Sequence, residues 1–276
     1  MNVELVAALP SAKARLIRSL VRHKKTRDTE RAFILEGAKP IQELLETNAS
    51  AVSTVVVTET WLKKHDRQLP QGLERVGTHV YACRESIFEQ LSDVSTPAGM
   101  LAVVRQPVWN QETIFQRPRL FGLYGECLQD PANVGTIIRT AAGFGLDALW
   151  LSSDSADVFN PKVVRATAGS LLALPVFYSK DLAPFTQHGC ALLATEPPGH
   201  GDREDSRAIR EIQRIPPRSI LALGNESRGL AETTLRQASL RFHIPVSRAI
   251  ESLNVAASAA IAIFYLAGLP REGVKR

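Results

Sequence analysis

Hydrophobic and polar residues follow one another along the chain in short blocks that predict strands alternating with helices. In the first hundred or so residues, apolar strands are expected at Arg31–Gly37, Val52–Thr58, His79–Cys83 and Gly99–Val104. Helices are expected at residues 12–22, Pro40–Glu46, Trp61–Arg67 and Glu85–Leu91, with a polar loop at His23–Asp28. This order predicts a small α/β sandwich.

The alternation continues in the second half with shorter and more apolar strands. These are expected at Leu120–Tyr124, Ala148–Leu151, Leu174–Tyr178, Ala191–Thr195, Ile220–Leu223 and Arg241–Ile244. Helices are expected at Val134–Phe144, Pro161–Thr167, Ala183–His188, Glu232–Gln237 and Val255–Leu266. Short apolar strands separated by helices predict a parallel sheet covered on both faces. Ligands of such sheets bind beyond the carboxyl ends of the strands.

The two halves are separated by a stretch without periodicity that contains Pro107 and Pro118. We therefore expect a first domain at residues 1–105, a linker at 106–118 and a second domain at 119–276. The proline-rich, polar segment Glu196–Arg218 is expected to be the most mobile loop of the second domain.

The last predicted helix, Val255–Leu266, is apolar on every side. Such a helix must be buried all round, in a core or against another subunit, and it favours a homodimer. It is too short for a membrane span and contains Ser258, which argues against a membrane anchor. Asn254 stands in the N-cap position, where its side chain can accept a bond from a free backbone amide.

Composition makes this an ordinary globular chain rather than a membrane or disordered one. Of its 276 residues, 45% are hydrophobic and 22% are charged, which is typical of soluble domains. The first residues show no basic segment followed by a long apolar one, so no secretory signal is expected. The cysteines, Cys83, Cys127 and Cys190, form no C-x-x-C pair. They argue against a zinc site and favour a reducing compartment, the cytoplasm.

Positive charge is concentrated at one end of the chain. Residues 1–31 hold eight basic and three acidic side chains, which accounts for the net charge of +5 of the whole chain. A basic cluster of this kind is typical of a polyanion-binding surface, although a solvated helix face would give the same pattern. The cluster comprises Arg18, Arg22, Lys24, Lys25 and Arg27.

Three stretches carry small, polar and amide side chains at a predicted junction of strand and helix. They are Asp130–Thr140, Leu221–Leu230 and the segment from Ile244 into the last helix. In order and spacing they resemble the signature motifs of the SpoU (TrmH-like) branch of the SPOUT superfamily, the RNA ribose 2′-O-methyltransferases. Three motifs in order are far more specific than a lone glycine motif.

This resemblance implies a fold and an activity. The fold is a C-terminal parallel-sheet SPOUT domain with a deep trefoil knot, preceded by a small α/β domain resembling ribosomal-protein RNA binders. The activity is S-adenosylmethionine-dependent 2′-O-methylation of a ribose in structured RNA, with no metal. An added RNA-binding domain favours ribosomal RNA, and transfer RNA stays open.

The resemblance also assigns roles to individual residues. Catalytic roles fall on Asn133, Arg139, Glu226, Ser252 and Asn254. Taken alone, each has a plainer explanation: Arg139 as a snorkelling helix residue, Glu226 as an exposed turn residue, and the others as helix caps. Because a guanidinium scarcely deprotonates, we expect Arg139 to bind the substrate and stabilise the developing alkoxide rather than to act as a base.

For the cofactor, the resemblance points to loops that would enclose the adenosine. The residues are Thr195, Leu223, Gly224, Ile244, Pro245 and Leu253. Arg228 stands where the motif more often has a small or acidic residue, which suggests an additional RNA contact. The basic cluster near the N-terminus is expected to contact phosphates without reading sequence.

Two rival functions remain open at this point. One is a catalytically silent RNA-binding or ribosome-assembly protein on the same fold. The other is a nicotinamide-dependent oxidoreductase, which the absence of a G-x-G-x-x-G fingerprint makes a distant second.

Overall fold

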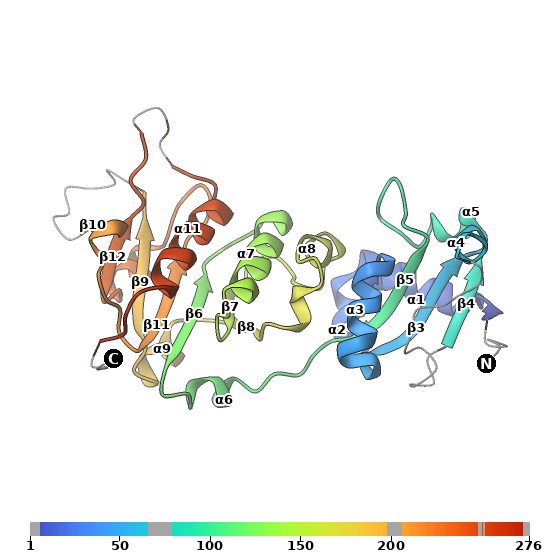
Figure 1. Ribbon diagram of the computed structural model, residues 1–276, viewed down its shortest axis with the longest axis horizontal. Helices are drawn as coiled ribbons and strands as arrows, with labels where there is room; N and C mark the ends of the chain where they lie inside the picture. Colours follow the sequence, from blue (N-terminus) through green and yellow to red (C-terminus); the bar gives the residue numbers. More distant parts are fainter. Residues whose placement is uncertain (1–5, 66–78, 198–205, 248–249, 251, 273–276) are drawn as a thin grey trace. The chain divides into compact units, whose positions relative to one another are not determined.

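The computed structural model describes residues 6–65, 79–197, 206–247, 250 and 252–272. The chain divides into two compact units, which are described separately (Figure 1). The first unit comprises Met1–Val108 together with Asp157–Gly169. The second unit comprises Trp109–Ala156 together with Ser170–Arg276. The first unit thus includes a short segment taken from the second half of the chain.

The first unit is built on a five-stranded sheet with the order β1-β4-β3-β5-β2. The strands are β1 Val6–Ala8, β2 Ala32–Glu36, β3 Val52–Thr58, β4 His79–Cys83 and β5 Met100–Arg105. β5 pairs antiparallel with β2 and β3, while β4 pairs parallel with β1 and β3. The predicted bounds of β3 and β4 are confirmed, whereas β1 has no counterpart among the predicted strands.

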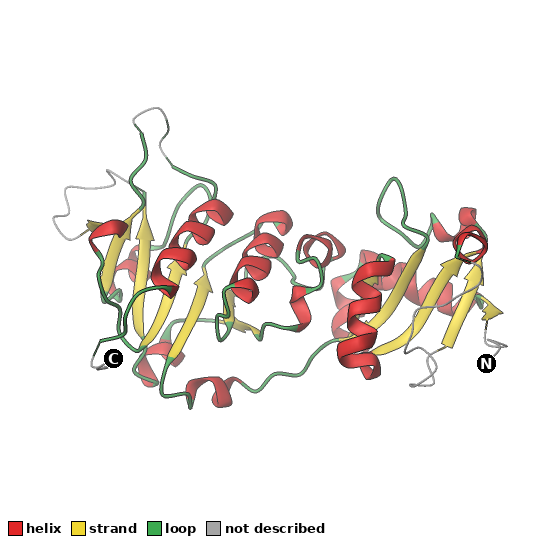
Figure 2. Ribbon diagram, in the orientation of Figure 1, coloured by secondary structure: helices red, strands yellow, loops and turns green. Residues whose placement is uncertain are grey.

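Helices cover both faces of this sheet. They are α1 Ser11–Arg22, α2 Lys24–Glu30, α3 Ala38–Asn48, α4 Glu59–Lys64, α5 Glu85–Phe88 and α8 Pro161–Ala166 (Figure 2). Along β2, Ala32 and Ile34 belong to a core shared with α1 and α5. The alternate residue Phe33 instead lies against Phe159, with ring centroids 5.1 Å apart. The period-two alternation of a strand buried on both sides explains this division.

Helix α2 corrects the prediction of a polar loop at His23–Asp28. Its sequence has no apolar periodicity, and tertiary contacts fix it instead. The guanidinium of Arg27 is 3% exposed. It donates to the Leu20 carbonyl at 2.6 Å and to the carboxylate of Asp157 at 2.6 and 2.9 Å. A buried arginine can be kept in a core only when it is paired and hydrogen-bonded in this way.

Replacing Arg27 with Met is expected to destabilise the first unit by about 3 kcal/mol, because it leaves the carboxylate of Asp157 buried without its partner. Urea denaturation followed by circular dichroism would measure the loss. The matched control is Lys24→Met, which breaks the exposed Lys24–Asp28 pair and is expected to cost well under about 1 kcal/mol. Equal losses for the two variants would contradict a structural role for Arg27.

The second unit contains the predicted parallel sheet, with the order β10-β12-β9-β11-β6-β7-β8. Every neighbouring pair in this sheet is parallel. Its strands are β6 Leu120–Gly125, β7 Leu149–Ser152, β8 Val176–Ser179, β9 Ala191–Glu196, β10 Ser206–Ala208, β11 Arg218–Leu223 and β12 Leu240–His243. The knot implied by the family resemblance stays a prediction.

The helices of this unit are α6 Gln111–Phe115, α7 Pro131–Gly143, α9 Ala183–Gln187, α10 Glu232–Arg236 and α11 Val255–Ala267. One core contains the apolar side chains of α6 and α9 together with Trp150, Ile220 and Ala222 of the central strands. Helix α11 packs against α7 and β11. Three one-turn 3-10 helices are also seen in the described part of the chain, at Ala49–Ala51, Ser170–Leu172 and Ile209–Glu211.

Two predicted irregular segments contain regular structure. Within the expected linker, Asn110 caps α6 by accepting a bond from the Glu112 amide at 3.0 Å, and Ile114 and Phe115 are buried. Arg218 donates to the Phe115 carbonyl at 2.8 Å and so fixes the helix to β11. Within the expected mobile loop lies β10, while residues 198–205 fall outside the described part of the chain.

The last helix is only partly buried within a single chain. Residues such as Ala259, Ala262 and Ile263 are buried, but Ile261 is 40% and Phe264 is 68% exposed. Phe144, which follows α7, is 47% exposed and its ring lies 5.9 Å from that of Phe264. None of the described helices is both long and apolar enough to cross a membrane.

Candidate active site

The first of the three motifs follows β6 and opens helix α7. Asp130 caps this helix, accepting a bond from the Ala132 amide at 2.9 Å, and Pro131 occupies its first turn. The helix therefore begins earlier than predicted, and Asn133 is not its N-cap. Asn133 instead lies within the first turn and is 8% exposed. Its side-chain amide is thus available for contacts with residues outside the helix.

The amide of Asn133 joins the three motifs in one hydrogen-bonded chain. Its Nδ2 donates to Oε1 of Glu226 at 3.0 Å. Its Oδ1 accepts from Nδ2 of Asn254, also at 3.0 Å. Asn254 caps α11 as predicted, accepting from the amides of Ala256 and Ala257. Hydrogen bonds therefore hold together three polar residues that are distant in sequence. Asn133 bonds to only one of the two carboxylate oxygens of Glu226.

Arg139 lies six residues further along α7 and is exposed. No hydrogen bond or ion pair joins its guanidinium to another of the described residues, Glu226 included. An unpaired guanidinium retains all five donors for a ligand. This geometry suits an arginine that binds an anionic or oxygen-rich substrate.

The second motif forms a tight turn after β11. The backbone groups of Asn225 and Gly229 bond to each other in both directions, at 3.0 and 2.9 Å. A Cβ atom on Gly224 would lie 2.1 Å from backbone atoms of Gly229 and Leu230. Gly229 has a φ of +68°, a left-handed conformation that favours glycine. The two glycines therefore allow the chain to double back with its backbone exposed to a ligand.

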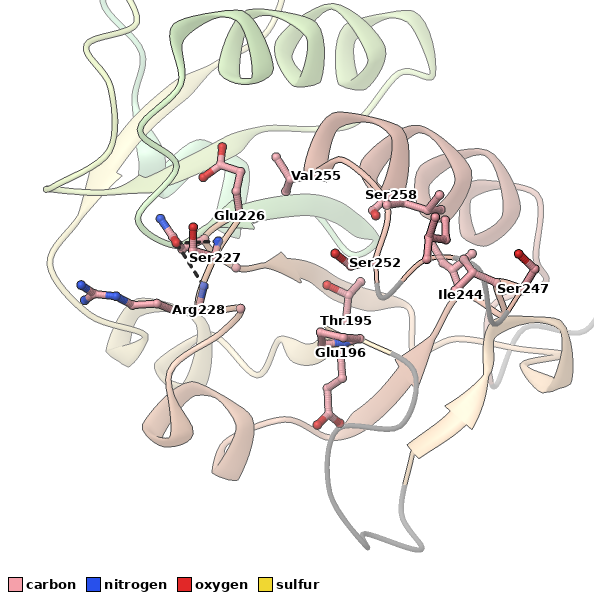
Figure 3. Close-up of a pocket in the computed structure, with 17 residues that line it drawn as sticks. Thr195, Glu196, Glu226, Ser227, Arg228, Ile244, Ser247, Ser252, Val255 and Ser258 are labelled. Carbon is pink, nitrogen blue, oxygen red and sulfur yellow. Dashed lines mark hydrogen bonds between the residues drawn. The ribbon is translucent and has the colours of Figure 1, made fainter.

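A cavity of about 680 Å³ opens at this turn (Figure 3). This volume is in the range that accommodates a cofactor-sized ligand. Figure 3 shows Thr195 of β9, Ile244 after β12, Ser252 before α11 and Ser258 on α11 around it. Glu226 lies on the turn, and Arg228 points away from Thr195 and Ser252. The residues that line it are Thr195, Glu196, Pro197, Gly224, Asn225, Glu226, Ser227, Arg228, Gly229, Ile244, Val246, Ser247, Ile250, Ser252, Leu253, Val255 and Ser258.

The cavity unites most of the predicted cofactor residues. Thr195, Gly224, Ile244 and Leu253 line it, as do Glu226 and Ser252 of the predicted catalytic set. Leu223 and Pro245 are not among the lining residues, although each adjoins one that is. The lining residues that sequence reasoning missed, such as Ser247 and Ser258, lie within the third motif, and only their position at the cavity distinguishes them from its other residues.

The predicted RNA-binding cluster is only partly on the surface. Arg22, Lys24 and Lys25 are exposed and Arg18 is half-buried. Arg18 donates to Gln90 and Lys24 pairs with Asp28, both at exposed positions. The prediction for Arg27 is wrong, because its guanidinium is buried against Asp157 and the end of α1 and cannot reach a phosphate.

The thiol of Cys127, just before the first motif, donates to Asp154 at 3.0 Å, and this bond raises the pKa of the thiol. A protonated thiol is a poor nucleophile. All three cysteines are free. Among the described residues there is no group of three or more side chains arranged to bind a metal ion.

Models of known protein families match both units of the chain. Residues 123–264 match the model of the SpoU rRNA Methylase family. Residues 12–102 match the MRM3-like substrate binding domain. The two matches cover the parallel-sheet unit with its three motifs and most of the five-stranded unit.

Several relatives align over nearly the whole chain. One is the 23S rRNA (guanosine(2553)-2′-O)-methyltransferase RlmP of Bacillus subtilis, 32% identical over 89% of this chain and 92% of its own. Another is a 23S rRNA (uridine(2479)-2′-O)-methyltransferase of Streptomyces viridochromogenes, 29% identical over 88% of this chain and 84% of its own. The crystal structure of an AdoMet-bound rRNA methyltransferase from Sinorhizobium meliloti is similar with a TM-score of 0.78, at 25% identity over 94% of this chain and 95% of that one. The chain belongs to the SpoU rRNA methylase family.

Proposed function

We propose that this protein transfers a methyl group from S-adenosylmethionine to the 2′-hydroxyl of a ribose in ribosomal RNA. The observation that carries the proposal is the meeting of the three motifs. Asn133, Glu226 and Asn254 form one hydrogen-bonded chain, and Glu226 also lines the cavity. Glu226 therefore belongs both to the cavity proposed for the cofactor and to the hydrogen-bonded chain of the three motifs.

The cavity fits S-adenosylmethionine in both size and chemistry. Its volume of about 680 Å³ accommodates a ligand of this size, and Gly224 lets the turn that forms its wall fold tightly against Gly229 and Leu230. Ile244 and Leu253 supply apolar surface, while Thr195, Ser247 and Ser252 supply polar groups. This mixture is typical of sites for amphipathic cofactors. S-adenosylmethionine supplies an electrophilic methyl group on its sulfonium, so the protein has to position the acceptor and exclude water.

Arg139 is assigned to the acceptor. Its exposed guanidinium, which has no partner in the part of the chain that the structure describes, is suited to binding a phosphate or ribose oxygen of the RNA and stabilising the charge that develops on the 2′-oxygen. Asn133 and Asn254 hold the carboxylate of Glu226 in one orientation at the cavity. Positioning of this kind supplies a large part of the rate enhancement when the electrophile is already reactive.

The first unit is proposed to bind the RNA substrate. It matches a substrate-binding domain, and it carries the exposed basic residues Arg22, Lys24 and Lys25. Side chains of this type contact phosphates and position RNA without reading its sequence. The division of roles expected from the sequence, residues 1–105 for RNA and 119–276 for catalysis, stays part of this proposal, although the compact units differ from it in that residues 157–169 group with the first unit. Arg228, exposed on the turn, is a further candidate for an RNA contact.

We also propose that two copies pair through α11. An all-apolar helix is stable in water only when it is covered, and Phe144, Ile261 and Phe264 form an exposed apolar surface on α7 and α11. Replacing Phe264 with Glu is expected to shift the protein from dimer to monomer in analytical ultracentrifugation. Val108→Glu, at an apolar residue that is 83% exposed in the first unit, should leave the dimer intact. A wild-type protein that is monomeric at micromolar concentration would contradict the pairing.

The function is tested by mapping ribose methylation across ribosomal RNA from cells with and without the protein. The proposal expects one 2′-O-methylated nucleotide to be lost when the protein is deleted and to return when it is restored. An unchanged map, with a site gained or lost in transfer RNA instead, would refute ribosomal RNA as the substrate. A ribosomal substrate is consistent with the cytoplasmic location expected from the sequence.

A further inference from the structure

Two residues that follow β6, Glu126 and Cys127, hold the turn that forms one wall of the cavity. Neither belongs to the three motifs, and neither lines the cavity. They lie between the end of a central strand and the cap of α7. Their contacts reach both ends of the segment from Gly224 to Ala231.

The carboxylate of Glu126 holds the far end of this segment. Its Oε2 accepts from the backbone amide of Ala231 at 2.8 Å. Its Oε1 accepts from the hydroxyl of Thr234 at 2.8 Å, and Thr234 is 2% exposed. The amide of Glu126 itself donates to the Leu223 carbonyl at 2.8 Å, which ties the residue to the end of β11. Hydrogen bonds to an ionised carboxylate are about twice as strong as those between neutral groups.

The near end of the segment is held by the backbone of Cys127. Its carbonyl accepts from Nδ2 of Asn225 at 2.8 Å. Oδ1 of the same Asn225 accepts from the amides of Ser227 and Arg228, at 2.9 and 3.2 Å (Figure 3). The amide of Cys127 is in turn bonded to the Ser152 hydroxyl at 2.7 Å. The turn is thus anchored to two neighbouring strands rather than being held by its own backbone alone.

We propose that Glu126 is a positioning residue for the cofactor site, acting through the turn that carries Gly224 and Glu226. The inference rests on the proposed binding of S-adenosylmethionine in the cavity. Without the two bonds from Ala231 and Thr234, the segment beyond Gly229 is free to move away from β6. The walls contributed by Gly224 to Gly229 then lose their fixed spacing, and the cofactor has to order them when it binds.

The simpler role for this carboxylate is to cap α10, whose N-cap residue is Ala231. A cap contributes to stability but leaves the affinity of a separate cavity unchanged. The two roles therefore differ in what they predict for cofactor binding, and that difference can be measured on the intact protein.

Calorimetric titration with S-adenosylmethionine provides the test. Glu126→Ala is expected to raise the dissociation constant about tenfold, the loss expected for charge-assisted hydrogen bonds that hold a binding loop. Glu126→Gln should raise it only about threefold, because the amide oxygen still accepts from Ala231 and the amide NH₂ can donate to the Thr234 oxygen, in neutral hydrogen bonds of about half the strength. Equal losses for the two variants would overturn the proposal, since the hydrogen bonds that Gln retains would then contribute nothing to cofactor binding.

A second pair of variants, at Thr234, tests the positioning role of Glu126 if Glu126→Ala fails to fold. Thr234→Val removes the hydroxyl and keeps the volume, whereas Thr234→Ser keeps the hydroxyl and loses a buried methyl group. The proposal expects Thr234→Val to weaken cofactor binding and Thr234→Ser to preserve it, even though Thr234→Ser also lowers the melting temperature. Affinity that follows the melting temperature across the pair would refute the positioning role.

Glu112→Ala is the matched control, because its side chain is 62% exposed on α6 and it meets only the His188 ring, at 3.7 Å, among the described residues. It should leave the affinity unchanged. A wild-type protein that fails to bind S-adenosylmethionine would refute the proposed function. Wild-type binding with no change in Glu126→Ala would refute only the role of Glu126.

Discussion

Replacing Arg139 with Ala is expected to lower kcat by about 10²- to 10³-fold, the usual cost of removing one group that stabilises developing negative charge. The affinity for S-adenosylmethionine should change little, because Arg139 is not among the residues that line the cavity. Transfer of a radiolabelled methyl group to ribosomal RNA, measured at saturating cofactor, would give the rate.

Arg139→Lys separates the two ways in which an arginine can act. A lysine keeps the positive charge but not the planar pair of donors that binds two oxygens at once. It should therefore recover only a small part of the lost rate. Full activity in Arg139→Lys would show that charge alone is sufficient, and Arg119→Ala, an exposed arginine at the opposite end of β6, serves as the control without effect.

Gly224→Ala is expected to abolish cofactor binding in the accessible concentration range. The new Cβ would lie 2.1 Å from backbone atoms of Gly229 and Leu230, a distance that requires the turn to move. Because the position of a Cβ atom is fixed by its own backbone and the atoms that it meets are backbone atoms, no side-chain rotation can relieve the contact. Calorimetric titration should show the dissociation constant rising by about 100-fold or more, which corresponds to roughly 3 kcal/mol.

The control for this variant is Gly143→Ala at the end of α7, where a Cβ meets nothing within 4 Å. It should bind S-adenosylmethionine like the wild type. Melting temperatures of the apo proteins show whether Gly224→Ala remains folded. A folded Gly224→Ala that binds normally would contradict the close approach of the turn to the cofactor.

Strands that are buried on both faces were the part of the fold that could be predicted most easily from the sequence. The β-branched run Val52–Thr58 can form little else than a strand, and its bounds are confirmed. Asn254 was predicted as a cap because an apolar helix begins directly after it. In both cases the local pattern and the tertiary structure require the same conformation.

Predictions were wrong where tertiary contacts determine the local structure. In the helix Lys24–Glu30, the buried guanidinium of Arg27 pairs with the carboxylate of Asp157, a residue 130 positions further along the chain. No local signal identifies that partner, so Arg27 was taken for a surface cation. The cap offered as the plainer explanation of Asn133 is likewise absent, because Asp130 caps the helix and Pro131 begins it, while its expected catalytic role stays a proposal.

The three motifs could be found from the sequence, but the groups that hold them together could not. The motif residues Asn133, Glu226 and Asn254 contact one another as their positions at strand ends suggest. Glu126 carries no comparable signal, since one acidic residue after an apolar strand is common. Its importance follows only from the two bonds that it accepts from Ala231 and Thr234.

A crystal structure of the protein grown with S-adenosylmethionine or its demethylated product would locate the cofactor. We expect the adenosine to lie against Gly224, Ile244 and Leu253, and the sulfur to face the side on which Glu226 and Asn133 are bonded. Ligand density in a different cavity, or none at a concentration that saturates binding in solution, would contradict this placement.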